Sequence, residues 1–416
     1  MLTALLSTSV VAATRTWTGT TSANWSVATN WGGTAPVSGD DLVFPASGAN
    51  QTTNDDLPAG TAFNSITFSG GTYVLNGNLI ALGAGGITAS GGTNQRINLP
   101  ILLTASQSWN VTNGSTTLAA GGALNLAGAA LTVSDISGGA IGFLGPVSGT
   151  GSITASEQTS LLFEALNTAT APITAHGGFV GFFDNTTYPG PITASGEPGA
   201  VVIAKGAIVG DVTVNGPLGT FVGGISATGP PNGTANTKNL TLRNLTVFEE
   251  TIASATDFAQ TSVTGTVNLT GSVIGIDSST TLPAGTQFTI IQNDGTDPVV
   301  GTFAGSPQGG TVTSVLGSGI QNYTIDYHGG DGNDVVITAQ APVTTQTTTV
   351  LTNTPPSIGQ PVTLTATVTP NTGTAIPTGT VTFFAIGGAF PGISSAVVLG
   401  TASLNGAGVA TLTATL

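Results

Sequence analysis

The sequence predicts an all-β protein, a right-handed parallel β-helix followed by a partial immunoglobulin-like β-sandwich. Apolar residues alternate with Thr, Ser and Asn at period two through the middle of the chain, no convincing amphipathic helix appears, and one short phrase keeps returning. A unit this short cannot bury an apolar face alone, so it must stack on copies of itself. An antiparallel sandwich array shares the alternation and is the alternative, but dipeptides that favour tight hairpins are few.

The returning phrase is Ile-Thr-Ala. Its isoleucines are Ile87, Ile153, Ile173 and Ile192, and a weakened copy begins at Ile225. The first three intervals suit a coil of roughly 20 to 22 residues, which lies in the range typical of solenoids. The last interval, from Ile192 to Ile225, does not fit a coil of that length. It predicts an irregular turn or an insertion between these two residues. Inward Leu or Val and outward Asn or Thr are expected in four further segments: Leu124-Asn125-Leu126, Val212-Thr213-Val214, Leu240-Thr241-Leu242 and Val267-Asn268-Leu269.

Composition and charge exclude several classes of function. The 416 residues include 5 basic and 19 acidic side chains, a net charge of −14, and no cysteine. Nucleic-acid binding and attraction to an anionic membrane both need Lys and Arg, so neither is expected. Without cysteine there are no disulfides or thiolate metal sites. With 39% hydrophobic residues the chain is expected to fold despite its 61 Gly and 22 Pro.

Residues 1–13 form an apolar stretch that ends in Val11-Ala12-Ala13, a small-residue pattern typical of a signal-peptide cleavage site. The stretch lacks the usual preceding basic residues, which leaves open a start upstream of Met1. It is too short to span a bilayer. The alternative is an ordinary first strand.

Residues 14–62 hold three of the four tryptophans, Trp17, Trp25 and Trp31. Large aromatic side chains can close the open end of a stacked core, so we expect an N-terminal cap. The alternative is an exposed carbohydrate platform. Together with Gly39-Asp40-Asp41, this pattern resembles the opening of bacterial autotransporter-passenger-like secreted β-helical surface proteins.

Residues 63–291 are the predicted β-helix. Trp109 is expected inside its core or in a stack. Four aromatic residues lie close to His176, and they are expected to form a packed ladder instead of a ligand pocket: Phe179, Phe182, Phe183 and Tyr188.

Residues 292–340 are expected to close the C-terminal end with paired strands. The run Gly329 to Ile337 resembles the tail of the same β-helical surface proteins, and it also fits the nonapeptide that binds calcium in stacked β-rolls. Calcium takes six to eight oxygens, which a single copy does not supply. A structural turn is therefore expected, with Asp331 and Asp334 as the candidate calcium ligands and no other cofactor.

Residues 341–354 are rich in Thr and Pro and predict a linker. Residues 355–416 alternate like the strands of an immunoglobulin-like sandwich. Their phrases, such as PVTLTATV and GVATLTATL, closely resemble bacterial Ig-like repeats of large surface proteins. Such modules ordinarily continue further, so an incomplete domain and a longer parent protein are expected.

Candidate catalytic groups are sparse. Glycosidic hydrolysis usually needs two carboxylates facing each other, whereas Glu249 and Glu250 are adjacent and would point to opposite faces of a strand. Other carboxylates could meet only if neighbouring coils place them together: Glu157 with Glu164, and Asp184 with Glu197. His176 and His328 lack a flanking nucleophile motif.

These observations predict a non-catalytic, extracellular structural or adhesive surface protein, a β-helical stalk with an Ig-like spacer. Binding over a broad face to a glycan or another surface ligand is expected, without nucleic acid and without membrane insertion. One alternative is a carbohydrate-active enzyme on a β-helix, either a polysaccharide lyase or a glycoside hydrolase. Another is a self-assembling surface-layer or fibre subunit.

Overall fold

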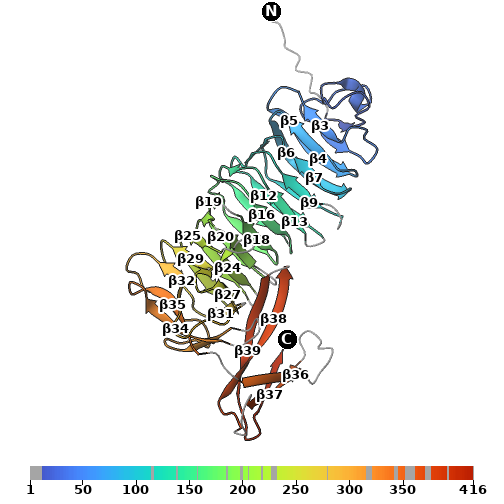
Figure 1. Cartoon of the computed structure of the whole chain (residues 1–416). Coiled ribbons are helices and arrows are strands. Elements are labelled where there is room, and N and C mark those ends of the chain that lie inside the picture. Colours follow the sequence, from blue (N-terminus) through green and yellow to red (C-terminus); the bar gives the residue numbers. More distant parts are fainter. Residues whose placement is uncertain are drawn as a thin grey trace, which may run out of the picture.

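The computed structural model is an elongated β-solenoid with further strands beyond its C-terminal end (Figure 1). It describes residues 12–113, 117–136, 139–156, 158–183, 186–196, 200–204, 206–216, 219–225, 232–278, 280–314, 321–341, 345–351, 361–370, 376–390 and 393–415. The all-β class and the parallel stacking predicted from the sequence are confirmed. Within these ranges the one helix is a short 3-10 turn, η1 (Ala28–Trp31). The predicted signal peptide lies almost wholly outside the described residues.

Sheet A is the longest face of the solenoid and has 15 strands. Its neighbouring strands pair in parallel, each contributed by the next coil of the chain. Its strands are β1 (Thr14–Thr16), β2 (Asp41–Phe44), β4 (Thr61–Ser69), β6 (Ile80–Gly91), β8 (Ile101–Leu103), β9 (Gln107–Val111), β11 (Leu124–Asn125), β12 (Ala130–Asp135), β14 (Val147–Ser148), β15 (Ser152–Ala155), β17 (Ile173–His176), β20 (Ile192–Ser195), β23 (Val212–Asn215), β26 (Leu240–Arg243) and β30 (Val267–Asn268).

Sheet B is the second face and has 12 strands. All of its pairs are parallel except that between β27 and β28. Its strands are β3 (Thr52–Asp55), β5 (Val74–Gly77), β7 (Gln95–Ile97), β10 (Leu118–Ala120), β13 (Ala140–Phe143), β16 (Ser160–Phe163), β18 (Phe179–Phe182), β21 (Ala200–Ala204), β24 (Thr220–Ile225), β27 (Val247–Ser254), β28 (Asp257–Phe258) and β31 (Val273–Ser278).

The third side of the coil is formed by different sheets in the two halves of the stack. In the N-terminal half it consists of β8, β11 and β14, which join sheet A through the long strand β6. From β17 onward the chain visits sheets A, B and C in turn. Sheet C has eight strands: β19 (Thr187–Tyr188), β22 (Ile208–Val209), β25 (Thr234–Thr237), β29 (Gln260–Val263), β32 (Gln287–Asn293), β33 (Thr311–Thr313), β34 (Asn322–Gly329) and β35 (Asp334–Ala339).

The recurring phrase stacks only in part. Ile153, Ile173 and Ile192 are direct partners on sheet A, as expected. Ile87 instead pairs with Trp109, whose column continues through Val133 and Ala155, so the first copy is displaced by two residues. The prediction for Ile225 is wrong, because this residue lies in β24 on sheet B.

The predicted insertion also lies elsewhere. Coils of 19 to 20 residues link Thr174, Thr193 and Thr213 on sheet A, but 28 residues separate Thr213 from its next partner, Thr241. The extra length falls between β24 and β25, after Ile225. A loop at a corner can grow without disturbing the strand register on either side, so the stack continues through it.

Alternation places the apolar side chains inside one continuous core. In all four segments named from the sequence, Leu and Val are buried while the intervening Asn or Thr is half-buried or exposed. Trp109, Phe143, Phe163 and Phe182 form a stacked aromatic column with centroid separations of 6.0, 5.0 and 5.2 Å. Of the four aromatic residues predicted to form a ladder, Phe182 belongs to this column, and Tyr188 packs beside it against Phe163 at 5.3 Å.

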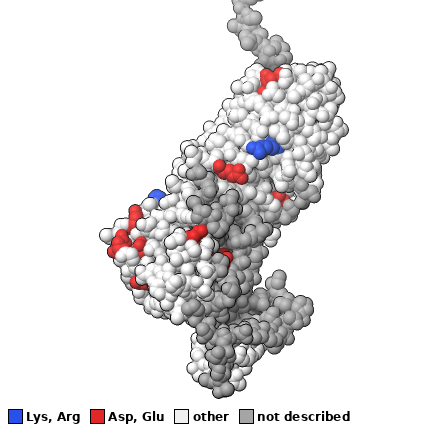
Figure 2. Space-filling view, viewed as in Figure 1, with Lys and Arg blue, Asp and Glu red and all other residues white. Residues whose placement is uncertain are grey.

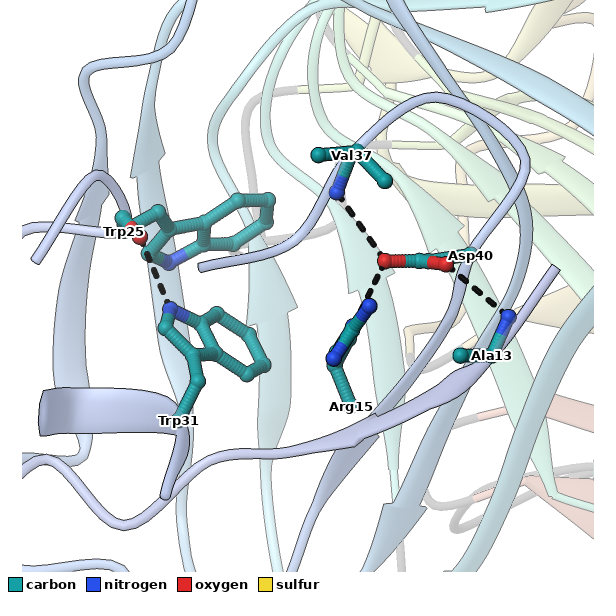
Figure 3. A network of polar contacts seen from close by, with 6 residues as sticks. All are labelled: Ala13, Arg15, Trp25, Trp31, Val37 and Asp40. Carbon is teal, nitrogen blue, oxygen red and sulfur yellow. Dashed lines mark hydrogen bonds and ion pairs between the residues drawn. The ribbon is translucent and has the colours of Figure 1, made fainter. Parts of the chain in front are cut away.

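The tryptophans of residues 14–62 are buried at the N-terminal end of this core. Trp17 and Trp25 are fully buried, Trp31 is 5% exposed, and the ring of Trp31 meets both others edge-on. The Trp31 indole N–H donates to the Trp25 carbonyl at 2.9 Å (Figure 3). Parallel stacking already includes β1 and β2, so the segment caps the core and also supplies its first coils.

A carboxylate fixes the loops around this cap. Asp40 is fully buried and accepts hydrogen bonds from the Ala13 N–H, the Arg15 side chain and the Val37 N–H (Figure 3). Burial raises the pKa of Asp40, but these three donors outweigh it and hold the pKa below its usual value.

The C-terminal end of the solenoid closes with antiparallel strands. β35 pairs antiparallel with both β32 and β34, and β33 pairs antiparallel with β34. Tyr323 and Tyr327 of β34 are buried against the last coils, and the Tyr327 hydroxyl donates to the Ser306 carbonyl at 2.7 Å. Paired closing strands are what the sequence predicted here.

The remaining strands form two small sheets. One contains β36 (Thr345–Leu351), β37 (Pro361–Pro370) and β40 (Val409–Thr415), and the other contains β38 (Thr380–Phe390) and β39 (Ile393–Ser403). Their core is small, with buried Val362, Leu364, Ala366, Phe383 and Ala410. The predicted linker is wrong in part, because β36 occupies residues 345–351 in its middle. The β-branched residues of this Thr-rich segment favour a strand, and all seven residues of β36 pair antiparallel with β37.

Candidate functional site

The most regular surface of the molecule is a column of threonines on the outside of sheet A, which we call the threonine ladder. Its members are direct partners in successive parallel strands, and each is half-buried or exposed between two buried neighbours: Thr132, Thr154, Thr174, Thr193, Thr213 and Thr241. Strand spacing sets the ladder's repeat at about 4.7–4.9 Å. The surface therefore carries evenly spaced hydroxyl groups with no charge among them.

A second polar column follows the ladder two residues further along each strand. Ser134 donates its hydroxyl to Asn110 Oδ1 at 2.7 Å, and on later coils His176 pairs with Ser195, which in turn pairs with Asn215. Hydrogen bonds between neighbouring coils hold these side chains in place. The column is neutral in its middle and ends at Arg243.

The described residues do not complete a catalytic triad around His176. Its Nδ1 lies 3.0 Å from the Ser195 hydroxyl, and both residues are on the polar column. In the described part of the chain no hydrogen bond joins a carboxylate to this pair, which is the contact that orients the base in a triad. His328 is exposed, and its backbone N–H donates to Asp326.

Glu249 and Glu250 are both buried in β27, at 3% and 1% exposure. As expected for consecutive strand residues, they point to opposite faces. Glu250 is on the same side as the core residues Phe248 and Ile252. Burial, and then the charge of Asp277, raise the pKa of Glu249 to about 8.

Burial also raises the pKa of Glu250 well above its usual value. Burial thus disfavours the ionised form of both carboxyl groups. Because they lie on opposite faces of one strand, they cannot flank one scissile bond.

The other predicted carboxylate pairs lie partly or wholly outside the described residues. Glu164 is exposed after β16, and its predicted partner Glu157 lies outside the described residues. Asp184 and Glu197 also lie outside them. Two basic side chains are engaged locally, Arg15 with Asp40 and Arg96 with Asn98 at 2.7 Å.

The two predicted calcium ligands, Asp331 and Asp334, differ in their exposure to solvent. Asp331 is exposed in the turn before β35, whereas Asp334 is 7% exposed and its Oδ1 accepts the Asn293 N–H at 2.9 Å. Burial, and then the charge of Asp331, raise the pKa of Asp334 above its usual value. Among the described residues no group of three His, Cys, Asp or Glu side chains could hold a metal ion.

Sequence reasoning missed the residues that the structure brings to Asp334. Asn293 and Asn333 are almost fully buried there, and the loop that follows β32 adds Asp297. The only local signal was the turn Asn293-Asp294-Gly295, which says nothing about a partner forty residues away. Figure 2 shows acidic side chains gathered at the edge of the molecule that carries the loops of sheet C, and few charges over the N-terminal coils.

The buried tryptophans cannot stack on a sugar from outside, because their ring faces pack on one another and on Phe44. An exposed carbohydrate platform at this end is therefore not formed. No helix in the described ranges has the length and apolar character needed to cross a membrane.

Comparison with known proteins identifies one part of the chain. Residues 348–416 match the family model of the bacterial Ig-like domain (group 3), which agrees with the two small sheets at the C-terminus. No curated protein matches the chain.

Proposed function

We propose that the chain is a non-catalytic structural and adhesive segment of an extracellular bacterial surface protein. The solenoid is a stiff stalk, the threonine ladder is the contact surface for a glycan or another surface ligand, and the Ig-like strands form a spacer. The threonine ladder is the observation that carries this proposal. The matched Ig-like family supports a bacterial surface or structural role.

The continuous core supports the role of a stalk. Buried side chains form one cluster from Trp17 to Ala339, so the solenoid has no internal boundary at which it could hinge. Each coil contacts only its neighbours, and stacking makes the rod as long as the number of coils. Such a body extends a surface away from its point of attachment.

The chemistry of the ladder favours a neutral polymer rich in hydroxyl groups. Each threonine hydroxyl can donate and accept a hydrogen bond, as can each sugar hydroxyl. Individual contacts of this kind are weak, but six in register could engage a repeating ligand together, and linked contacts multiply affinity. The ladder offers no charged group to pair with an ionic ligand.

The arrangement of carboxyl groups supports the non-catalytic part of the proposal. Glu249 and Glu250 point to opposite faces of their strand. A glycosidase needs two carboxyls across one bond, and a lyase needs basic groups near the substrate.

A polysaccharide binding assay tests the proposal. The purified chain is incubated with a neutral glycan array and with insoluble neutral polysaccharides, and bound protein is measured. The double substitution T174E/T193E places charge in the centre of the ladder, and T289E is the matched control on the outside of sheet C. We expect the double variant to bind at least about tenfold more weakly and T289E to bind like the natural chain, because only the former disturbs the ladder.

Two results would contradict the proposal. Binding that survives in T174E/T193E would remove the ladder as the contact surface. Release of reducing ends from any bound polysaccharide would show catalysis. Circular dichroism of each variant confirms that the solenoid is intact before binding is compared.

A further inference from the structure

Two loops meet where sheet C ends. β32 ends at Asn293, and β35 begins at Asp334. The two strands are antiparallel, and their last paired residues are Ile291 and Val335. Two residues beyond that pair on each strand are Asn293 and Asn333, which the topology thus brings together although forty residues separate them.

Both asparagine side chains hold the same backbone carbonyl. Asn293 Nδ2 donates to the Asp297 carbonyl oxygen at 2.8 Å, and Asn333 Nδ2 donates to the same atom at 2.9 Å. Asn333 Nδ2 also lies 3.4 Å from the carbonyl oxygens of Asp294 and Gly295. Because only the NH₂ group of an amide can donate to a carbonyl, these contacts fix which end of each amide is the oxygen.

Three side-chain oxygens remain without a donor. Asn293 Oδ1, Asn333 Oδ1 and Asp297 Oδ2 are buried and accept no hydrogen bond from the described residues. Asn293 is 1% exposed and Asn333 is 5% exposed. Buried polar atoms in folded proteins nearly always have a partner, so three such acceptors on residues that share one carbonyl call for a donor or a cation.

The surrounding charge selects a cation. The two loops contribute Asp294, Asp297, Asp331 and Asp334, and neither 293–297 nor 329–334 contains Lys or Arg. A bound cation would offset this concentration of acidic groups.

We propose that these loops bind a divalent cation, preferentially calcium, through Asn293 Oδ1, Asn333 Oδ1 and Asp297 Oδ2. Amide and carboxylate oxygens in an irregular loop suit calcium, which accepts flexible geometry, whereas magnesium requires a near-ideal octahedron. Three protein oxygens leave the rest of the shell to water, so we expect an affinity on the order of 10⁻⁴–10⁻³ M, typical of extracellular modules.

This site differs from the one suggested by the nonapeptide resemblance. There Asp331 and Asp334 were the candidates and a second stacked copy was required. Here the second set of ligands comes from the loop after β32. Asp334 Oδ1 is used to hold the Asn293 backbone, so its role is to position that residue.

Equilibrium dialysis of the full chain against radioactive calcium tests the proposal, with magnesium as competitor. We expect one calcium per chain. D297N keeps the shape of the side chain but removes its charge and one ligand oxygen, and it should weaken binding at least about tenfold. D294N is the matched control: it makes the same change three residues away, at an exposed carboxylate, and should shift the affinity less than about threefold.

The remaining outcomes each decide the question. Equal weakening by D294N and D297N would indicate general attraction to an acidic loop and would overturn the site. No calcium bound at 5 mM, about five times the weakest expected dissociation constant, would also overturn it. Thermal unfolding with and without calcium provides a second measurement, in which the natural chain and D294N should gain stability and D297N should not.

Discussion

The aromatic column of the core gives the most quantitative prediction. Phe163 is fully buried, with Phe143 stacked on one side at 5.0 Å and Phe182 on the other at 5.2 Å. The substitution F163A removes the central ring and leaves a gap between two rings whose positions are set by their own strands.

The size of the effect follows from how little the gap can close. Truncation of a buried Phe to Ala lowers the free energy of unfolding by about 3–5 kcal/mol, depending on how far the surrounding side chains collapse into the gap. Here the backbone ladder holds neighbouring coils about 4.7–4.9 Å apart, so β13 and β18 cannot move toward each other. Two stacked contacts are lost as well, each about 0.5–1.5 kcal/mol beyond area burial. We therefore expect F163A to lower the free energy of unfolding by about 4–5 kcal/mol, the upper part of this range.

Urea unfolding followed by far-ultraviolet circular dichroism measures the change, and amide hydrogen exchange locates it. Protection should fall first in β13, β16 and β18, because each coil depends on its neighbours. F183A is the matched control, since Phe183 is only half-buried after β18, and it should cost about 1–2 kcal/mol. A loss below about 1.5 kcal/mol for F163A would refute the view that the column is closely packed and unable to relax.

Three further predictions concern backbone, charge and the cap. G151A should destabilise by about 2–4 kcal/mol in the same unfolding assay, because Gly151 has a φ of +123° and a Cβ there would lie 2.0 Å from the Ala129 carbonyl oxygen; an unchanged midpoint would contradict this. The raised pKa of Glu250 gives a contribution to stability that is fully present below the ordinary pKa of 4.5 and is lost progressively as the pH rises toward the raised pKa. E250Q should remove this slope, about 1.4 kcal/mol per pH unit above pH 4.5, and an unaltered slope would show that Glu250 is charged. D40N should cost about 1–3 kcal/mol at pH 7. Because the pKa of Asp40 is lowered from 3.8, its stabilisation is present above pH 3.8 and is lost as the pH falls through the lowered pKa, so the cost of D40N should shrink in acid. A cost that does not change with pH would argue against an ionised Asp40.

Period-two alternation was enough to predict the solenoid, because it decides which side chains face inward on every coil. It could not predict the register. Ile87 is displaced by two positions from the Ile153 column, and a shift of two residues preserves the inward and outward pattern, so local sequence carries no sign of it. The placement of Ile225 failed for a related reason, since strands of sheets A and B have the same alternation.

The threonine ladder was partly foreseen. Outward Thr was expected at Thr213 and Thr241, but the alignment of six such residues on one face depends on coil lengths that vary from 19 to 28 residues. Only the paired strands establish that the added residues after β24 leave this face in register.

The sequence by itself determined the all-β class, the inward and outward faces of the strands, the closing hairpin and the Ig-like C-terminus, because all of these depend on short-range alternation and turn chemistry. Only the tertiary structure decided the coil register, the burial of Glu250 and the meeting of Asn293 with Asn333. These depend on which distant segments become neighbours, and the energy of a buried polar group is set by those neighbours and not by its position in the chain.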